Sequence, residues 1–404
     1  MKHRRFLAAL LAAAVLCPLA ALAAGEKNVD NLPTGNLEGF ESSITWFGED
    51  FAYDITDEEA CWELLQRPIT VLDVSEKEVV YPRVSPNGEK VVNEWMGGSI
   101  NGSLAAVHVL GEDEDGWTLI EGMDYYDRII RGYVKTSLLK TVTPNNKYGI
   151  IIDKLTQRLY MFIDGKLWSS CAVSTGLPNK DQPYNETAAG EYLIGSWVGG
   201  FDSEGMYCEM GIRFNGGDLL HQVPYVEFAD GTKDFSKYGS QLGRKASHGC
   251  VRVARTANDE GLCISWLWEN LKKNTKVVVW DDDGRTLPYP DDDLEVYYNP
   301  DGGTSYHATA TCRSVRDKYL PLTAFTYGEL DSGKYASLTG CTNCIPVKRR
   351  AEIDEINQER IDLGELLKNP VYTGGATIGG GAQAEGSADS DSPEASDGVT
   401  ITIR

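Results

Sequence analysis

Residues 148–168 read YGIIIDKLTQRLYMFIDGKLW and decide the fold class of the central part of the chain. Two runs of β-branched and aromatic residues, 150–152 and 158–163, flank a polar turn, and Asp164-Gly165 offers a type I′ hairpin into a third run. These runs predict an antiparallel meander that opens a domain near Tyr148. Further strands are expected at 171–174, 191–195, 210–214 and 276–280, and apolar residues at helical spacing predict a helix within 256–273, capped by Asn258 or Asp259.

The segment before the meander is also rich in short strand signals. Runs such as ITVLDV, which begins at Ile69, and GWTLIEG, which begins at Gly116, are divided by glycine-rich and acidic turns. This pattern predicts a small β-barrel at 61–143, after a linker or N-terminal segment at 25–60. The sequence DGWTLI at 115–120, followed by RGYV at 131–134, resembles bacterial Src-homology-three-like domains.

The first 24 residues predict export as a signal peptide. A basic MKHRR start is followed by a proline-interrupted apolar stretch and by Ala21-Leu22-Ala23, a small-x-small cleavage signal. An uncleaved membrane anchor is the alternative, because the apolar stretch is near the lower limit of about 17 residues for a membrane span. No later segment is apolar enough to span a membrane. The net charge of −22 argues against nucleic acid or an anionic membrane surface as a partner.

The stretch SHGCVR at 247–252 places an imidazole two residues before a thiol and a guanidinium two residues after it. Attack on a carbonyl needs the thiolate, but a cysteine thiol is mostly protonated near pH 7. An imidazole within hydrogen-bond reach of the thiol usually takes this proton. In an extended segment His248 points to the same side as Cys250. His221, which follows two leucines at what looks like a strand end, is the other candidate base for Cys250.

Cysteine pairing offers a different interpretation of Cys250. Cleavage would remove Cys17 and leave eight cysteines, which an exported protein is expected to pair. Cys250 would then form a disulfide with Cys263 or Cys208, and the two histidines would be ordinary polar residues. If Cys250 stays free, seven cysteines remain and complete pairing fails. Cys171 and Cys208 are expected to be structural, whereas Cys61 and Cys263 have no assignment.

A distal histidine followed by Ser-His-Gly-Cys-hydrophobic-Arg resembles the signature of the L,D-transpeptidase (YkuD-type) catalytic domain of bacterial cell-wall synthesis. Two upstream motifs, VSTG at 173–176 and TAAGEY at 187–192, resemble that family's STG…TPxGxF stretch, with Ala188-Ala189 where proline is common. The resemblance covers 147–282. It implies a mainly β fold with a few helices, in which a β-sandwich catalytic domain is flanked by the small β-barrel and by a small Cys/His module.

The resemblance also implies roles for individual residues. Cys250 would be the nucleophile and His221 the general base, while His248 and Gly249 would shape the pocket and backbone N–H groups near Cys250 would form the oxyanion hole. On the substrate side, Arg252 would pair with a substrate carboxylate, a task suited to its planar fork of donors. Ser247 would hydrogen-bond within the loop beside it.

Two departures from the family pattern leave questions open. Gln222 stands where the family often has Gly or Ser, so the group that orients His221 is unassigned. The 25 residues between His221 and Ser247 exceed the commoner family spacing, and the insertion at 227–245 is interpreted as a lid or as a change to the acceptor site.

The implied reaction is acyl transfer on peptidoglycan stem peptides, in the wall or secreted space of a bacterium. Cys250 would attack the carbonyl before the terminal D-Ala of a stem tetrapeptide, release D-Ala and form a thioester. An amine of a second stem peptide would resolve the thioester and cross-link the wall, with no cofactor needed for catalysis. Hydrolysis of the thioester would instead make an L,D-carboxypeptidase, and a third alternative is a non-catalytic wall-binding protein.

A second chemical motif lies at 294–347, where His307-x4-Cys312 is followed by Cys341-x2-Cys344. One imidazole and three thiols form a ligand set suited to a structural tetrahedral zinc, and the arrangement resembles Ada-type metal-binding modules. The alternative is a disulfide between Cys312 and either Cys341 or Cys344. Residues 352–404 predict a helix followed by a disordered tail, since 374–398 has almost no large apolar residue.

Overall fold

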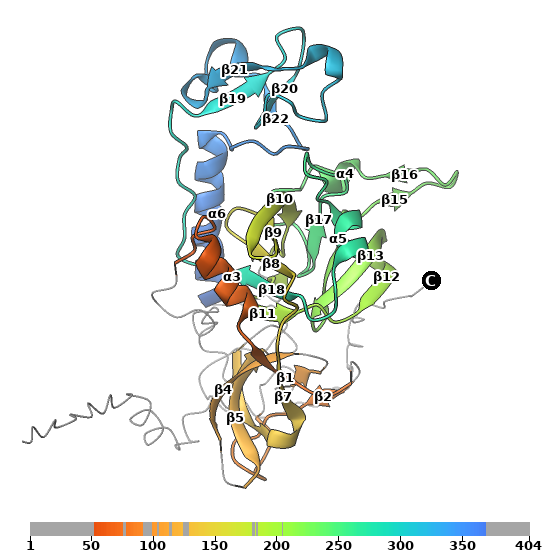
Figure 1. Ribbon diagram of the computed structural model, residues 1–404, viewed down its shortest axis with the longest axis vertical. Coiled ribbons are helices and arrows are strands. Elements are labelled where there is room, and N and C mark those ends of the chain that lie inside the picture. Colours follow the sequence, from red (N-terminus) through yellow and green to blue (C-terminus); the bar gives the residue numbers. More distant parts are fainter. Residues whose placement is uncertain are drawn as a thin grey trace, which may run out of the picture.

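The protein is described by a computed structural model that covers residues 52–368 apart from 76–77, 92–98, 103–104, 113–114, 124–128, 180–181, 183–184 and 204. The predicted signal peptide, most of the 25–60 segment and the predicted disordered tail lie outside the described residues. The described part is mainly β, as predicted, and its three β-rich units follow one another along the long axis of Figure 1. Of the helices in these residues, none is both long enough and apolar enough to cross a membrane.

The first unit is a five-stranded sheet in the order β6-β5-β4-β1-β7. Its strands are β1 (Ile69–Leu72), β4 (Ala106–Glu112), β5 (Trp117–Met123), β6 (Ile129–Lys135) and β7 (Leu139–Val142), and β2 (Val79–Val80) pairs with β3 (Ile100–Asn101). Leu72, Ile120 and Val134 from the sheet share a core with Val80 and Ile100 from the pair. The pair therefore covers one face of the sheet.

The second unit contains nine hydrogen-bonded strands in the order β11-β18-β8-β9-β10-β17-β14-β13-β12. They are β8 (Tyr148–Asp153), β9 (Arg158–Ile163), β10 (Lys166–Ser174), β11 (Gly190–Leu193), β12 (Trp197–Ser203), β13 (Met206–Asn215), β14 (Asp218–Gln222), β17 (Val251–Val253) and β18 (Lys276–Trp280). The long strand β10 pairs with β9 on one side and with β17 on the other. The predicted meander is β8, β9 and β10, with Asp164 and Gly165 at positive φ in its turn.

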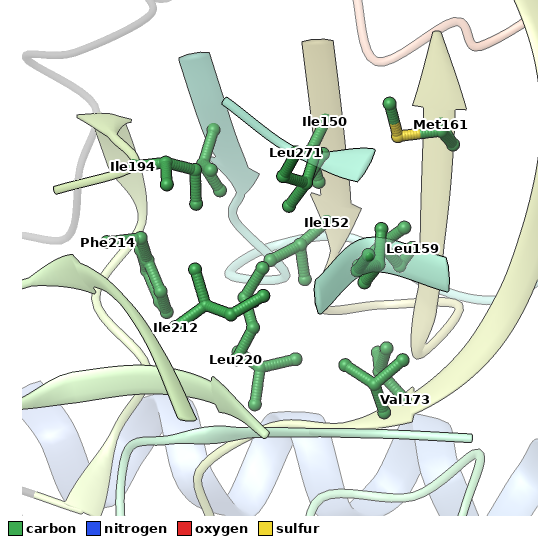
Figure 2. Packing of buried hydrophobic residues seen from close by; sticks show 14 of the residues in the cluster. Ile150, Ile152, Leu159, Met161, Val173, Ile194, Ile212, Phe214, Leu220 and Leu271 are labelled. Atoms are coloured by element: carbon green, nitrogen blue, oxygen red, sulfur yellow. The ribbon is translucent and has the colours of Figure 1, made fainter. Parts of the chain in front are cut away.

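The core of this unit lies between the two halves of the strand order. Ile150 and Ile152 of β8 pack in one cluster with Ile212 of β13 and Leu220 of β14, and all four are fully buried (Figure 2). Strands far apart in the order can share a core only when the sheet folds over onto itself. The unit is therefore a β-sandwich of two layers joined through β10, which confirms the predicted fold class.

One helix begins later in the chain than the sequence predicted. Helix α5 (Ile264–Asn270) begins after Cys263, whereas the sequence predicted a cap at Asn258 or Asp259. Asn258 instead accepts a hydrogen bond from the Leu262 N–H at 2.8 Å and donates to the Ser170 carbonyl at 2.9 Å. Because its side chain ties a loop to β10, the helix begins several residues later.

Helix α3 (Glu58–Gln66) spans the predicted boundary between the linker and the barrel and packs on the sandwich. Leu65 lies in a cluster with Ile151, Phe162 and Trp280 of the sandwich. The Lys276 ammonium, from β18, donates to the carbonyls of Leu64 and Arg67, both at 2.8 Å. A cation at the C-terminal end of a helix satisfies carbonyls that have no partner within the helix and interacts favourably with the helix dipole.

The third unit is a four-stranded sheet in the order β21-β19-β20-β22, followed by helix α6. Its elements are β19 (Glu295–Tyr298), β20 (Ser305–His307), β21 (Thr323–Thr326), β22 (Thr339–Gly340) and α6 (Arg350–Lys368). Figure 1 shows α6 running down from this sheet along the side of the sandwich. The Arg360 side chain of α6 pairs with Asp282 at 2.7 Å, which fixes the helix there.

Replacing Leu65 with Ala should reduce the free energy of unfolding of the sandwich by about 2–5 kcal/mol, since Leu65 is fully buried between α3 and the sheet. Urea denaturation, monitored by tryptophan fluorescence, would measure this change in the free energy of unfolding. The exposed neighbour Glu63→Ala should change the value by less than about 0.5 kcal/mol. A loss as small in Leu65→Ala would mean that α3 contributes nothing to the stability of this unit.

Candidate active site

The parallel pairing of β14 and β17 places the predicted base and the predicted nucleophile at neighbouring positions of the sheet. Leu220 lies beside Val251 and His221 beside Arg252. Leu220 and Val251 point into the core of the sandwich, so the alternation of side chains sends His221 and Arg252 to the opposite face. Cys250 immediately precedes β17 and falls on that same outer face.

Aromatic packing fixes the place of the thiol. Cys250 is half-buried and packs against the cluster of Phe201, Cys208 and Leu219. The Phe201 ring lies edge-on to the His221 imidazole, with centroids 5.3 Å apart. Burial raises the pKa of the Cys250 thiol above its ordinary value, and the nearby Asp218 carboxylate raises it further. At rest, Cys250 is therefore a neutral thiol.

The structure supplies the orienting group for His221 that the sequence left unassigned. The imidazole is buried, with 3% exposure, and its Nδ1 lies 2.7 Å from the carbonyl oxygen of Gln222. A carbonyl only accepts, so Nδ1 carries the proton and Nε2 is left with a free lone pair. Burial lowers the pKa of His221 to about 4, with the Arg252 cation lowering it as well. The ring is thus neutral at physiological pH, as a general base must be.

The three motifs that the sequence singled out converge on the loop before Cys250. The Thr175 carbonyl accepts hydrogen bonds from the N–H groups of Ala246 and Ser247, at 2.9 and 3.0 Å. The Thr187 hydroxyl accepts from the Gly176 N–H at 2.8 Å and donates to the Gly249 carbonyl at 2.5 Å. The VSTG and TAAGEY stretches therefore hold the backbone of the SHGC stretch.

The remaining predicted residues of the loop differ in exposure. Ser247 is buried, and its hydroxyl donates to the Cys250 carbonyl and accepts from the Gly249 N–H at 3.3 Å. His248, in contrast, is exposed at the surface. Ser247 thus closes a tight turn around Cys250, while His248 faces solvent.

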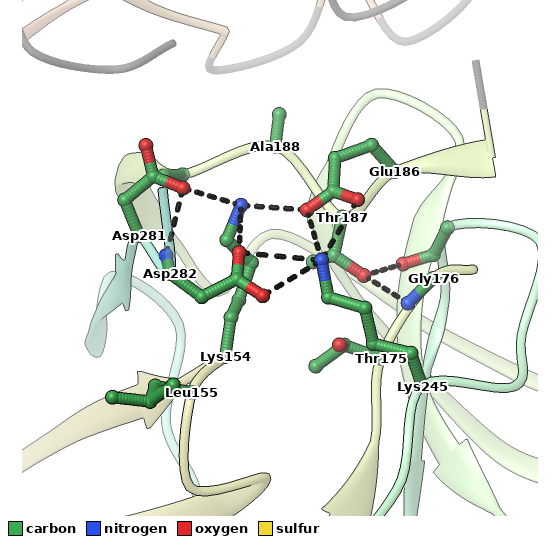
Figure 3. A network of polar contacts seen from close by, with 12 residues as sticks. Lys154, Leu155, Thr175, Gly176, Glu186, Thr187, Ala188, Lys245, Asp281 and Asp282 are labelled. Atoms are coloured by element: carbon green, nitrogen blue, oxygen red, sulfur yellow. Dashed lines mark hydrogen bonds and ion pairs between the residues drawn. The ribbon is translucent and has the colours of Figure 1, made fainter. Parts of the chain in front are cut away.

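Below this loop lies a buried cluster of charges that the sequence gave no sign of (Figure 3). The Lys245 ammonium, two residues before Ser247, lies 3.0 Å from Glu186 and 2.9 Å from Asp282. Lys154 also contacts Glu186, at 2.6 Å, and Arg360 of α6 contacts Asp282. Because these groups are all buried, removing one partner would leave an uncompensated charge, so the cluster fixes the loop firmly.

Arg252 is covered in the structure rather than open to solvent. Its side chain is on the outer face with His221, but the residue is only 4% exposed. Its Nη1 donates to the Gln241 amide oxygen at 2.6 Å, and its guanidinium lies over the Tyr238 ring at 5.4 Å from the centroid. Both partners belong to the insertion at 227–245, which contains β15 (Val226–Glu227), β16 (Lys233–Asp234) and α4 (Ser236–Gly239).

Asp218 is a residue of the site that sequence reasoning missed. It begins β14, three residues before His221, and is buried against Gly249. A Cβ at position 249 would lie 2.6 Å from the Asp218 Oδ1, and Gly249 has φ +119°, so only glycine fits there. Burial raises the pKa of Asp218 to about 7. In the sequence, the only sign of this role is that Asp218 lies three residues before His221. That spacing becomes informative only once β14 pairs with β17 and brings Asp218 against Gly249.

Replacing Asp218 with Asn should make Cys250 more reactive in alkaline solution. The pKa of Asp218 near 7 means that the wild-type carboxylate is charged above that pH and opposes the thiolate, whereas below it the carboxyl group is neutral and has little effect. We expect alkylation of Cys250 by iodoacetamide to be about three- to tenfold faster in the variant at about pH 8.5 and similar to wild type at about pH 5.5.

The exposed carboxylate variant Asp230→Asn, in the turn of the insertion, serves as the control and should match wild type at both pH values. An unchanged rate in Asp218→Asn at alkaline pH would show that this carboxyl group does not act on the thiol.

The predicted Cys/His ligands also meet, in the third unit. His307, Cys312, Cys341 and Cys344 place one ligand atom each within 4.8 Å of all the others. Cys312 Sγ lies 3.9 Å from Cys341 Sγ, and Cys344 Sγ lies 3.7 Å from His307 Nδ1. Zinc–sulfur bonds of about 2.3 Å put two sulfurs on a tetrahedral ion roughly 3.8 Å apart, so the donor set fits zinc.

The backbone around these thiols also suits a metal site. The Ala308 N–H donates to Cys344 Sγ at 3.3 Å, and the Asn343 N–H donates to Cys341 Sγ at 3.4 Å. Such hydrogen bonds stabilise thiolates and orient them toward an ion. The set is closed, with three sulfurs and one nitrogen, and leaves no position for a substrate.

The expected cysteine pairing does not appear. All eight cysteines among the described residues are free thiols, namely Cys61, Cys171, Cys208, Cys250, Cys263, Cys312, Cys341 and Cys344. Cys171 and Cys208 are buried, and burial raises the pKa of each to about 12, so they pack as small apolar side chains. Cys61 and Cys263, which the sequence left unassigned, are buried in the same way.

Comparison with known proteins gives a match for the sandwich. The family model of the YkuD-type L,D-transpeptidase catalytic domain matches residues 147–279, about a third of the chain. The match confirms, for this segment, the resemblance that the sequence motifs indicated. The resemblances of the first and third units stay predictions. No curated protein matches the chain.

Solved structures of L,D-transpeptidases are similar to parts of the chain, with low sequence identity and low TM-scores. Residues 123-326 of the enzyme from Xylanimonas cellulosilytica DSM 15894 are 20% identical, over 34% of this chain and 61% of that chain, with a TM-score of 0.24. The Stackebrandtia nassauensis enzyme is 22% identical, over 33% and 56%, with a TM-score of 0.22. An L,D-transpeptidase from Mycobacterium tuberculosis H37Rv is 14% identical, over 57% and 86%, with a TM-score of 0.27. The chain thus spans less than two thirds of the first two, and similarity at this level does not establish a shared function.

Proposed function

We propose that the protein is an exported peptidoglycan L,D-transpeptidase in which Cys250 is the nucleophile and His221 the general base. The observation that carries this proposal is the parallel pairing of β14 and β17, which sets the buried imidazole on the same face as the thiol. The match of residues 147–279 to the L,D-transpeptidase catalytic domain supports the same reaction class.

The first half of the reaction begins from a neutral thiol and a neutral imidazole. As Cys250 attacks the carbonyl before the terminal D-Ala of a stem tetrapeptide, Nε2 of His221 takes the thiol proton. The Gln222 carbonyl stabilises the imidazolium that forms, because it accepts from Nδ1–H. His221 then gives the proton to the leaving amine of D-Ala, which leaves a thioester on Cys250.

The charge on the tetrahedral oxygen needs donors that are already in place. We assign this task to backbone N–H groups near Cys250, with His248 and Gly249 shaping the pocket. The hydrogen bonds of Thr175 and Thr187 hold this backbone rigid, so little reorganisation is needed as the charge develops. Oxyanion donors of this kind contribute roughly 3–4 kcal/mol each.

In the second half, an amine of another stem peptide attacks the thioester, and His221 accepts its proton. The new amide bond forms as the C–S bond breaks, and the released Cys250 thiolate takes the proton back from His221, which restores the resting site. Water in place of the amine would give the alternative activity, an L,D-carboxypeptidase. The two reactions use the same Cys250 and His221 and differ only in the acceptor that reaches the thioester. A wall-binding protein without catalysis is the further alternative, but it gives no reason for a buried neutral imidazole on the same face of the sheet as a half-buried thiol.

Incubation with a disaccharide-tetrapeptide should give a thioester on Cys250 with loss of D-Ala, measured by intact-mass spectrometry with peptide mapping. Cys250→Ala should form no adduct. His221→Ala should slow acylation by about 10²-fold or more, because general-base catalysis contributes that much. Gln222→Ala should keep most of the rate, because its main-chain carbonyl, and not its side chain, contacts the imidazole.

Equal losses in His221→Ala and Gln222→Ala would refute the assignment of the base. Release of D-Ala by Cys250→Ala at the wild-type rate would refute the mechanism as a whole. Addition of an amine acceptor then divides transpeptidase from carboxypeptidase, since only the former gives a cross-linked product.

We also propose that His307, Cys312, Cys341 and Cys344 hold a structural zinc ion in the third unit. The spacing of the four ligand atoms and the N–H donors to Cys341 and Cys344 support it. The ion would have no part in the reaction. It would hold β20 against the loop after β22, and so fix the start of the segment that leads into α6.

The purified full chain should contain about one zinc ion, measured by inductively coupled plasma mass spectrometry, and Cys344→Ser should lose most of it. The buried thiol variant Cys263→Ala, which lies outside the cluster, should keep the metal. Metal-free wild-type protein with Cys312 mapped into a disulfide would contradict the proposal.

A further inference from the structure

Arg252 is a buried cation that no carboxylate neutralises within the described part of the chain. The titratable groups that raise the pKa of its guanidinium are Cys208, Tyr238 and Cys250, and none of them is a carboxylate. Among the described residues, its side chain donates one hydrogen bond, which goes to the amide oxygen of Gln241, a neutral acceptor, at 2.6 Å. A guanidinium has five N–H donors in a planar fork, and removing it from water is costly unless an anion pairs with it.

The side chains around the Arg252 guanidinium are an aromatic ring and a neutral amide, and they leave its charge without an anionic partner among the described residues. The Tyr238 ring covers the flat side of the guanidinium, with 5.4 Å between the guanidinium carbon and the ring centroid. Tyr238 is itself buried with Val223 and Met206, so the ring is a fixed wall. The edge of the fork that meets Gln241 is the edge at which a carboxylate would make two parallel hydrogen bonds.

The Gln241 side chain can leave this edge without moving the backbone. The Gln241 carbonyl is held by the Ser174 hydroxyl at 2.7 Å, and the Gly243 N–H donates to the Val173 carbonyl at 2.9 Å. The backbone on this side of the insertion is thus tied to β10, while the contact to Arg252 is made by the end of a flexible side chain. Rotation of that side chain would uncover the guanidinium.

We propose that Gln241 occupies the place of the substrate's terminal carboxylate on Arg252, and that the site prefers donor peptides with a free terminal carboxylate because these can displace Gln241 and pair with the guanidinium. This rests on the proposed function. In the resting protein the amide oxygen satisfies part of the guanidinium. A carboxylate displaces it because a charge-assisted, bidentate pair is stronger than one hydrogen bond to a neutral amide. Gln241 acts only through Arg252, as the group with which the substrate carboxylate competes.

The test compares acylation of Cys250 by a stem tetrapeptide with a free terminal carboxylate and by the same peptide with a terminal amide. The ratio of the two second-order rate constants measures the preference. Gln241→Glu places a permanent carboxylate on Arg252, so the ratio should fall by about tenfold. Gln241→Ala removes the competitor, so the ratio should stay at the wild-type value or rise.

Ser240→Glu is the matched control, because it adds the same charge at the exposed neighbouring position. Its charge is screened by solvent and should leave the ratio within about twofold of wild type. A fall in Ser240→Glu equal to that in Gln241→Glu would overturn the proposal, and so would an unchanged ratio in Gln241→Glu or a collapsed ratio in Gln241→Ala.

A second readout separates this inference from the proposed function. Alkylation of Cys250 by anionic iodoacetate and by neutral iodoacetamide reports whether Arg252 attracts an anion near the thiol, without any peptide. The iodoacetate-to-iodoacetamide rate ratio should fall in Gln241→Glu and not in Ser240→Glu. If no peptide acylates even the wild type, the proposed function fails, and this ratio alone decides whether Gln241 competes with anions for Arg252.

Discussion

The parallel pairing of β14 with β17 is the constraint on which the rest of the site depends. Adjacent strands can run parallel only if the chain between them crosses back over the sheet, which takes a dozen or more residues. Here that crossover is the segment 223–250, and it includes the insertion at 227–245. The long spacing between His221 and Ser247 is therefore part of the architecture. The same crossover brings Tyr238 and Gln241 against Arg252 and places Lys245 two residues before Ser247.

The loop that ends this crossover is held from both sides. The Thr175 carbonyl and the Thr187 hydroxyl hold its backbone on one side, and the Lys245 ammonium fixes it on the other through Glu186 and Asp282. Buried ion pairs add little net stability, but each member needs its partner. Since Arg360 of α6 belongs to the same cluster, the C-terminal helix is physically continuous with the support of the catalytic loop.

Burial also sets the chemistry of the site. It lowers the pKa of His221 and raises the pKa of Cys250, so both groups rest in their neutral forms. A resting thiolate would be exposed to oxidation and alkylation, whereas a neutral thiol becomes nucleophilic only when the imidazole takes its proton. The proton transfer and the attack are thereby linked. Arg252 is buried near them without a carboxylate partner among the described residues, so its positive charge is not neutralised there.

The sequence by itself determined the features that depend on neighbouring residues. The alternation in 148–168, the Asp164-Gly165 turn and the VSTG, TAAGEY and SHGC stretches each carry their meaning within a few residues, so the meander and the candidate nucleophile could be read directly. The helix within 256–273 was read with the wrong start because Asn258 bonds to β10, which is distant in sequence.

Only the tertiary structure decided how the distant pieces meet. The Gln222 carbonyl orients His221, Asp218 packs under Gly249, and Gln241 covers Arg252. None of these contacts has a sequence signal, because each depends on which strands pair and on where a long crossover returns. Burial decided the protonation of His221 and Cys250 for the same reason, since the desolvation that shifts a pKa comes from the whole fold around a group and not from its neighbours along the chain.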